Sequence, residues 1–218
     1  MKTKATLFSI ILFNTDESTS IYHEEYSLGS FSYFKRTPIQ EMLRFLSKRV
    51  AHSLDTNVPQ ELIHKVEESD SYKFFVKEKA SLIFVVSTFL EYPSNTLSLL
   101  VEDIGTFILE SRDRVKHTQE RSRPEEIDRA HKEEKTAVAA LIKAQIKEYQ
   151  DYEQKDIMLQ IKNELGKVEE ILTKTVESAL GRGEKIDELI SSADSLSFQT
   201  KSLYKLSKKQ NKKCCGIM

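Results

Sequence analysis

The sequence predicts an α+β protein in which a five-stranded sheet flanked by helices is followed by a long C-terminal coiled-coil helix. In the first half, apolar segments follow the order strand, strand, helix, three strands, helix. Ten of the eleven Phe lie within residues 1–110, whereas the second half is rich in Lys, Glu, Gln and Ser. From Met158 onward the apolar residues repeat about every 3.5 residues, the period of a coiled coil.

Five segments of the first half have the composition of strands. Residues 5–13 are almost continuously apolar, which is typical of a buried strand. The later segments are rich in β-branched and aromatic residues or alternate weakly. The polar break at residues 77–79 predicts a hairpin between the last two strands. The expected strands are 5–13, 21–28, 62–66, 72–76 and 82–89.

Two helices are expected in the same half. Thr37, Pro38 and Gln40 form a capping box with Pro in the first turn, so the first helix is predicted to begin there. Its apolar stripe consists of Ile39, Met42, Leu43, Leu46 and Val50. The second helix follows Glu91-Tyr92-Pro93-Ser94, and its apolar face extends from Leu97 to Ile108.

The composition predicts four regions along the chain. Residues 1–115 are expected to form the folded domain. Residues 116–154 are expected to be a charged linker, helical after Pro124. Residues 155–211 are the coiled-coil motif, and residues 212–218 are a lipidation tail.

In the segment with the 3.5-residue repeat, the apolar residues form one stripe along the helix, called the seam here. One helix cannot bury this seam alone, so the segment needs partner helices. The apolar seam residues are Met158, Ile161, Leu165, Val168, Leu172, Ala179, Ile186, Leu189, Ala193, Leu196 and Leu203. Arg182 interrupts the seam near its middle. A buried guanidinium requires acceptor oxygens on the partners, and a single polar layer fixes helix register. The alternative is an exposed Arg on a helix whose seam is shorter.

The last five residues carry a lipidation signal. Cys215-Gly216-Ile217-Met218 fits the C-a-a-X box for prenylation, and Met in the last position favours farnesyl. The adjacent Cys214 is a candidate for palmitoylation or for a second prenyl group. Two lipids anchor a protein stably, whereas one gives reversible binding. The preceding lysines favour an anionic membrane leaflet; they are Lys201, Lys205, Lys208, Lys209, Lys212 and Lys213.

The composition argues against several other classes of protein. A net charge of −1 gives no basic surface for nucleic acid. The two Cys form no disulfide framework, which fits the cytosol. The five His show no metal-ligand spacing, and no catalytic arrangement stands out, so we expect no cofactor, no metal site and no enzymatic activity. A prenylated small GTPase would need a phosphate-binding loop G-x-x-x-x-G-K-[ST], which the sequence lacks.

Two stretches resemble R-SNAREs of the synaptobrevin family. Residues 179–189, Ala-Leu-Gly-Arg-Gly-Glu-Lys-Ile-Asp-Glu-Leu, are similar to the centre of the R-SNARE motif, where Arg182 falls on the central ionic layer. The tail with Cys214 and Cys215 resembles that of the lipid-anchored longin R-SNARE. Residues 31–36, 39–41 and 91–94 are similar to segments of its longin domain.

This resemblance implies a fold, partners and a location. The first half would be a longin (profilin-like) domain with an antiparallel sheet. Residues from about 155 to 211 would pair with three Q-SNARE helices and drive docking and fusion of vesicles. Disassembly machinery and SNARE chaperones would act on the complex. The protein would be cytoplasmic and peripheral on the cytosolic face of Golgi, endosomal, vacuolar or vesicle membranes, in ER–Golgi, intra-Golgi or endosome/vacuole transport.

The resemblance also implies that the longin domain folds back on the SNARE segment and inhibits it. Leu43 and Phe45 on the first helix are candidate groove residues for this contact, although core packing is the alternative for each. The rival function is a lipid-anchored coiled-coil adaptor without fusion activity. An adaptor predicts homo-oligomers, whereas a SNARE predicts a bundle with three different Gln-bearing helices.

Overall fold

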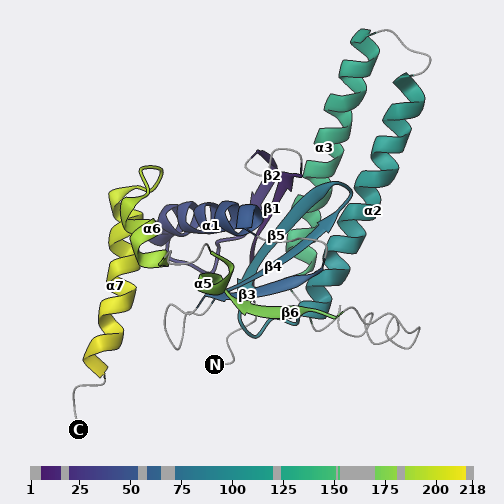
Figure 1. Cartoon of the computed structure of the whole chain (residues 1–218). Helices are drawn as coiled ribbons and strands as arrows, with labels where there is room; N and C mark the ends of the chain where they lie inside the picture. The colour runs from purple at the N-terminus through teal and green to yellow at the C-terminus, as the bar shows by residue number, and fades with distance from the viewer. Residues whose placement is uncertain are drawn as a thin grey trace.

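A mixed six-stranded sheet lies at the centre of the molecule, with strand order β2-β1-β5-β4-β3-β6 (Figure 1). The five strands from the first half pair antiparallel, and β6 pairs parallel to β3. The first five strands are β1 (Leu7–Asn14), β2 (Ile21–Tyr26), β3 (Gln60–His64), β4 (Tyr72–Lys79) and β5 (Leu82–Phe89), and the sixth is β6 (Leu172–Thr175). The predicted α+β class is confirmed, and a sixth strand is added at the edge.

The computed structural model describes residues 6–15, 20–53, 58–64, 72–119, 124–150, 152, 170–180 and 185–214. For residues 53, 117–119 and 207–214 it describes the backbone alone. The helices within these ranges are α1 (Tyr33–Ser53), α2 (Ser94–Gln119), α3 (Pro124–Glu148), α5 (Val176–Ala179), α6 (Ile186–Ser192) and α7 (Phe198–Cys214).

Helix α1 begins earlier than the capping residues predict. It starts at Tyr33 and contains Pro38 within the helix. The predicted N-cap at Thr37 is therefore wrong. Pro38 is the sixth helical residue, so its missing N–H removes only an early hydrogen bond of the helix.

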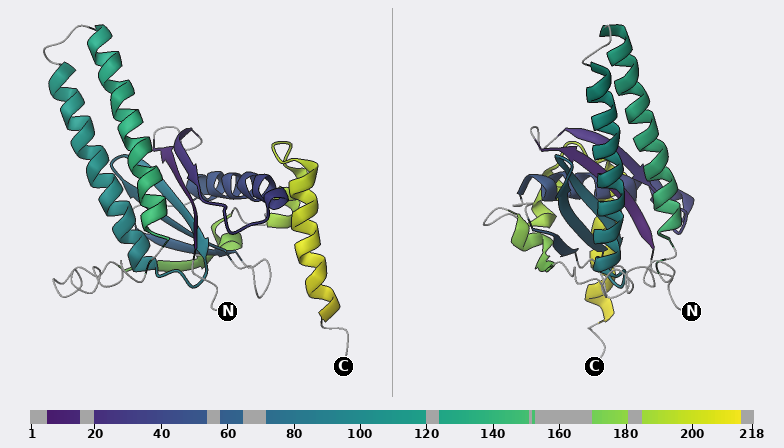
Figure 2. Two further views of the ribbon diagram at one scale, coloured as in Figure 1. Left: turned by 180° about the vertical axis from the view of Figure 1, so that it is seen from behind. Right: turned by 90° about the vertical axis from the view of Figure 1, so that its right-hand side faces the viewer.

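The sheet separates two apolar cores, one on each face. One core lies under α1 and also takes apolar side chains from α5, α6 and α7. The other lies under α2 and α3. The two views in Figure 2 place α1 and α7 on one side of the sheet and the α2–α3 pair on the other. Central strands such as β1 and β5 are buried on both faces, which explains their continuous apolar sequence.

Helix α3 occupies most of the range that the sequence predicts to be a charged linker. Its side chains Val138, Ile142 and Ile146 are buried in the core beneath α2, and Tyr149 just beyond it is also fully buried. Tyr149 Oη donates to Asp103 Oδ2 of α2 at 2.9 Å, and Tyr92 Oη donates to the carbonyl of Tyr149 at 2.7 Å. The second half of α3 is thus part of the folded body, while its first half extends past the sheet beside α2 (Figure 1).

The expected long C-terminal helix is divided among several elements within the described residues. In this state residues 172–214 contain β6, α5, α6 and α7. An amphipathic segment without partner helices buries its apolar residues against the nearest apolar surface. Here that surface is the α1 face of the sheet. The edge strand β3 pairs with an extended partner, so Leu172–Thr175 forms a strand rather than a helix.

Candidate functional site

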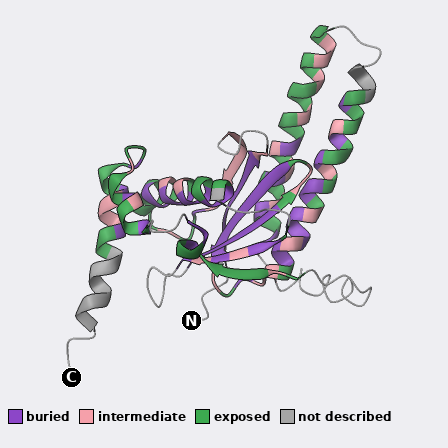
Figure 3. Cartoon of the chain, viewed as in Figure 1, coloured by how far each residue is buried: buried purple, intermediate pink, exposed green. Residues whose placement is uncertain are grey.

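The C-terminal segment docks on the edge of the sheet through β6. Residues Gln60–Ile63 pair with Leu172–Thr175 in parallel register. The side chains of this short strand are exposed, so Figure 3 draws it green beside the buried central strands. Lys174 Nζ donates to Gln60 Oε1 at 2.9 Å. The backbone ladder therefore supplies most of the contact here, with side chains adding polar links.

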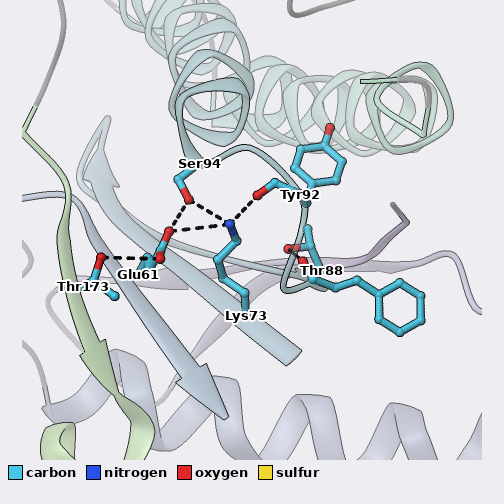
Figure 4. Close-up of polar contacts among 7 residues, drawn as sticks. Glu61, Lys73, Thr88, Tyr92, Ser94 and Thr173 are labelled. Atoms are coloured by element: carbon cyan, nitrogen blue, oxygen red, sulfur yellow. Dashed lines mark hydrogen bonds and ion pairs between the residues drawn. The ribbon is translucent and has the colours of Figure 1, made fainter. Parts of the chain in front are cut away.

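A cluster of polar side chains connects β3 to the neighbouring elements (Figure 4). Glu61 accepts hydrogen bonds from Thr173 Oγ1 at 3.4 Å and from Ser94 Oγ. Lys73 on β4 lies 3.5 Å from Glu61 Oε2, and its Nζ donates to the carbonyl of Tyr92 and to Ser94 Oγ at 2.9 Å. Burial lowers the pKa of Lys73, and the carboxylate of Glu61 opposes that shift. The cluster joins β3, β4, the start of α2 and β6.

Beyond β6 the docked segment, defined here as residues 172–180 and 185–206, contributes apolar side chains to the core under α1. Thr175 and Ser178 form a capping box that begins α5 directly after the strand. The buried apolar residues of the docked segment are Val176, Ala179, Leu180, Ile186, Ile190, Leu196 and Tyr204. They join the same core cluster as Leu43 and Val50 of α1.

A carboxylate on α1 caps α7. Glu41 Oε2 accepts from the backbone N–H of Ser197 at 3.0 Å and from Thr200 Oγ1 at 2.6 Å. Burial alone would raise the pKa of Glu41, but the hydrogen bonds from Thr200 and Ser197 outweigh it and lower that pKa. The negative charge also complements the positive end of the α7 dipole.

Tyr204 fixes the middle of α7 against β3. Its side chain is 4% exposed, and its ring stacks on that of His64 with 6.0 Å between centroids. Its hydroxyl donates to Asp187 Oδ1 of α6 at 2.8 Å. Burial, followed by the Asp187 carboxylate, raises the pKa of Tyr204. The side chain therefore ties α6, α7 and β3 together.

The structure brings part of the predicted seam into this interface. Ala179, Ile186 and Leu196 are buried, while Leu189, Ala193 and Leu203 pack on the core with partial burial. Leu172 points outward and is 39% exposed. Four other seam residues lie outside the described residues, namely Met158, Ile161, Leu165 and Val168, as does Arg182.

Sequence reasoning missed three of the most deeply buried residues of the docked segment. Val176, Ile190 and Tyr204 are 0%, 1% and 4% exposed, and none belongs to the predicted seam. Each directly follows a position of the 3.5-residue repeat, namely Thr175, Leu189 and Leu203. A second apolar stripe, offset by one residue from the first, was the signal that could have identified them.

The two groove candidates on α1 have different positions. Leu43 is fully buried in the core, which agrees with core packing, the alternative to a groove contact for that residue. Phe45 is partly buried, packs on the same core, and lines a surface hollow together with Leu196 and Ser195 of the docked segment. Phe45 is therefore the candidate that lies at the contact with the C-terminal segment.

The lipidation tail is only partly described. Cys214 is the last residue of α7, where the backbone alone is described, and Cys215 lies outside the described residues. Among the described residues no helix has the length and apolarity needed to cross a bilayer.

Comparison with known proteins identifies the family. The family model Synaptobrevin matches residues 157–216. The chain is 32% identical over 194 residues to the synaptobrevin homolog ykt6 of Schizosaccharomyces pombe, covering 87% of each chain. It is 28% identical to the YKT6 homologs of Yarrowia lipolytica and Saccharomyces cerevisiae, over 191 and 196 residues and 88% of each chain. The chain therefore belongs to the synaptobrevin family as a longin-type R-SNARE, a non-enzymatic protein of vesicle trafficking.

Proposed function

We propose that this R-SNARE promotes docking and fusion of vesicles by zippering with three Q-SNARE helices, and that its longin domain holds it inactive until those partners engage. One observation carries the proposal of autoinhibition. Seam residues that a four-helix bundle must bury, among them Ala179, Ile186 and Leu196, are buried against the longin domain instead. Because one side chain cannot occupy both sites, the closed arrangement and the bundle compete.

Phe45→Glu tests the closed arrangement. The substitution removes the apolar ring that packs on the core and lines the hollow with Leu196, and the loss of this apolar contact would disfavour docking of the segment. We expect faster proteolysis within residues 172–206 and faster bundle formation with Q-SNAREs. The control is Lys48→Glu, which places a carboxylate at an exposed position of the same hollow and, because it also removes a cation, changes the charge by more than Phe45→Glu does. Unchanged proteolysis and membrane partitioning of the Phe45 variant would contradict the fold-back proposal.

Arg182 is proposed to form the central ionic layer of the bundle, where it would donate to three glutamine side chains. A charged layer costs stability but fixes register. Arg182→Leu is therefore expected to relax partner selection more than it weakens the bundle. Competition among reconstituted Q-SNARE sets measures partner selection. An unchanged partner set in the variant would contradict the proposed role of Arg182.

The anchor is proposed to be lipid on Cys215, with farnesyl favoured, and palmitoyl or a second prenyl group on Cys214. The lysines from Lys201 to Lys213 support it by favouring an anionic leaflet. Intact-mass analysis of the C-terminus, from soluble and membrane fractions of the native cell, tests the anchor. Unmodified cysteines in both fractions would overturn it.

The same experiments separate a fusion protein from an adaptor. An R-SNARE forms a bundle with one copy of each of three Q-SNARE helices, and SNARE chaperones and disassembly machinery act on that bundle. A lipid-anchored adaptor forms homo-oligomers without them. We propose that the protein moves between the cytosol and the cytosolic face of Golgi, endosomal, vacuolar or vesicle membranes. We also propose that boundaries near residues 115, 155 and 212 separate the longin domain, the linker, the SNARE motif and the lipidation tail.

A further inference from the structure

Two aromatic side chains at the start of α1 stand out from the surface. Tyr33 and Phe34 are 77% and 88% exposed, and their rings meet edge to face with 5.7 Å between centroids. Among the described residues Phe34 is the most exposed of the large apolar side chains. The family role proposed above uses neither residue. Single exposed apolar residues are ordinary, whereas an adjoining aromatic pair at a helix end indicates a contact surface.

The pair is held in place by the chain on either side of it. Phe31, two residues before Tyr33, packs against Phe8 of the core with 5.1 Å between ring centroids. Arg36 folds back on the preceding loop, where its Nε donates to the carbonyl of Phe31 at 3.1 Å and its Nη2 to that of Gly29 at 3.5 Å. The aromatic pair therefore projects from a fixed helix start, and ordering it on a ligand costs little entropy.

The sequence neighbours of the pair carry positive charge only. Residues 26–40 contain no Asp or Glu, and their only charged side chains are Lys35 and Arg36, both exposed. Aromatic rings with basic neighbours suit the boundary between water and lipid, where rings enter the headgroup layer and cations contact lipid phosphates. This charge pattern complements an anionic bilayer.

The pair is accessible while the C-terminal segment is docked. Helix α7 reaches the same end of α1, where Thr200 Oγ1 lies 3.5 Å from the carbonyl of Pro38 and bonds to Glu41, yet it leaves Tyr33 and Phe34 exposed. We propose that Tyr33 and Phe34, with Lys35 and Arg36, form a non-covalent site for anionic membrane that works in the closed state. The site is independent of the proposed lipids on Cys214 and Cys215.

A tryptophan reporter tests insertion directly, because the chain has no Trp. The probe is the full-length chain carrying Cys214→Ser, Cys215→Ser and Phe34→Trp, mixed with phosphatidylserine-containing vesicles. We expect a blue-shifted emission and quenching by brominated lipid. The matched control places the reporter on the other face of the sheet as Leu109→Trp, a residue 43% exposed on α2, where neither signal is expected.

Vesicle binding by the same cysteine-free chain gives the second measurement. Tyr33→Ser with Phe34→Ser should lower partitioning about tenfold or more, because two aromatic side chains no longer leave water. Leu109→Ser is the control and should leave partitioning unchanged. Lys35→Gln or Arg36→Gln should lower it about fivefold each, and vesicles of phosphatidylcholine alone should bind more weakly.

Three outcomes would overturn the proposal. Co-sedimentation with an unshifted Phe34→Trp emission would assign binding to the lysine-rich tail instead. Equal binding to neutral and anionic vesicles would remove the role of Lys35 and Arg36. A Phe34→Trp shift that appears only with added membrane proteins, and never with lipid, would make the pair a protein-binding site. Because both cysteines are replaced, these failures leave the lipid anchor and the autoinhibition untouched.

Discussion

Glu41 shows how one side chain on α1 controls the start of α7. Its carboxylate accepts two hydrogen bonds at the start of α7, one from the N–H of Ser197, which directly precedes the helix, and one from Thr200 Oγ1 in its first turn. These bonds favour the ionised form and lower the pKa of Glu41 below its ordinary value of 4.5. A depressed pKa means that docking gains stability above the ordinary value and loses it as pH falls through the lowered pKa. The contact is therefore intact at neutral pH and weakens only in acid.

We predict that Glu41→Ala raises the population of undocked α7 about fivefold, which corresponds to about 1 kcal/mol for exposed hydrogen bonds to a charge. Amide hydrogen exchange in residues 198–206 measures the change. Gln40→Ala removes the exposed neighbouring side chain on α1 and should leave that exchange unchanged. Equal exchange in the two variants would show that the cap contributes nothing.

Tyr204 offers a way to open the protein without disabling the bundle. It is buried against β3 but lies one position beyond the seam residue Leu203, so a four-helix bundle would not need it. Tyr204→Ala should weaken docking by about 2–4 kcal/mol, the range for deleting a large buried side chain. We expect faster assembly with Q-SNARE helices and an unchanged melting temperature of the finished bundle. Leu203→Ala should lower that melting temperature, and a fall of similar size in the Tyr204 variant would contradict this separation.

The residue types of a segment explain which strands could be predicted from the sequence and which could not. The strands of the first half followed from continuous or alternating apolar residues. The predicted hairpin is confirmed by pairing of β4 with β5, but residues 77–79, predicted to be its break, belong to β4, and the turn lies at Ala80 and Ser81. Leu172–Thr175 could not be predicted as a strand, because its residues continue a helical repeat and the free edge of β3 that binds them is a tertiary feature. For the same reason, the repeat indicated a partner-facing seam but not the offset stripe at Val176 and Tyr204.

At the level of whole elements, α3 shows that a high charge density does not exclude a helix from the core. Its exposed faces carry the charges, while Val138, Ile142 and Ile146 recur at helical spacing on the buried face. The hydrogen bond from Gln150 Nε2 to the carbonyl of Leu7, at 2.7 Å, ties the end of this region to β1. The C-terminal part of α3 therefore belongs to the domain that holds the SNARE segment.

We predict that Ile142→Ala destabilises the longin domain by about 2–4 kcal/mol, because it leaves a cavity between α3 and the sheet. Urea denaturation followed by circular dichroism measures the loss. Ala140→Ser changes an exposed residue of the same helix and should shift the midpoint little. If Ile142→Ala behaves like Ala140→Ser, the packing of α3 on the sheet is not maintained in solution.

For the whole molecule, the two arrangements of the C-terminal segment share one set of side chains. Bundle formation with Q-SNAREs must therefore remove β6 from β3 and uncover part of the core under α1. We predict that amide exchange in Gln60–His64 rises when the bundle forms, whereas β1 and β5 stay protected because they lie inside the sheet. Unchanged exchange at β3 in the assembled bundle would mean that β6 stays docked, and the competition model would fail.

The parallel pairing of β6 with β3 has a mechanical consequence. When tension runs along the strand axis from the Leu172 end, the backbone hydrogen bonds between β6 and Gln60–Ile63 are loaded together rather than broken one by one. Hydrogen bonds loaded side by side resist a steady pull far better than bonds loaded in sequence. The extended strand also rises about 3.3 Å per residue against about 1.5 Å in a helix, so rewinding it shortens the chain as it lets go. The pairing of β6 with β3 should therefore resist tension up to a threshold force and then dissociate abruptly.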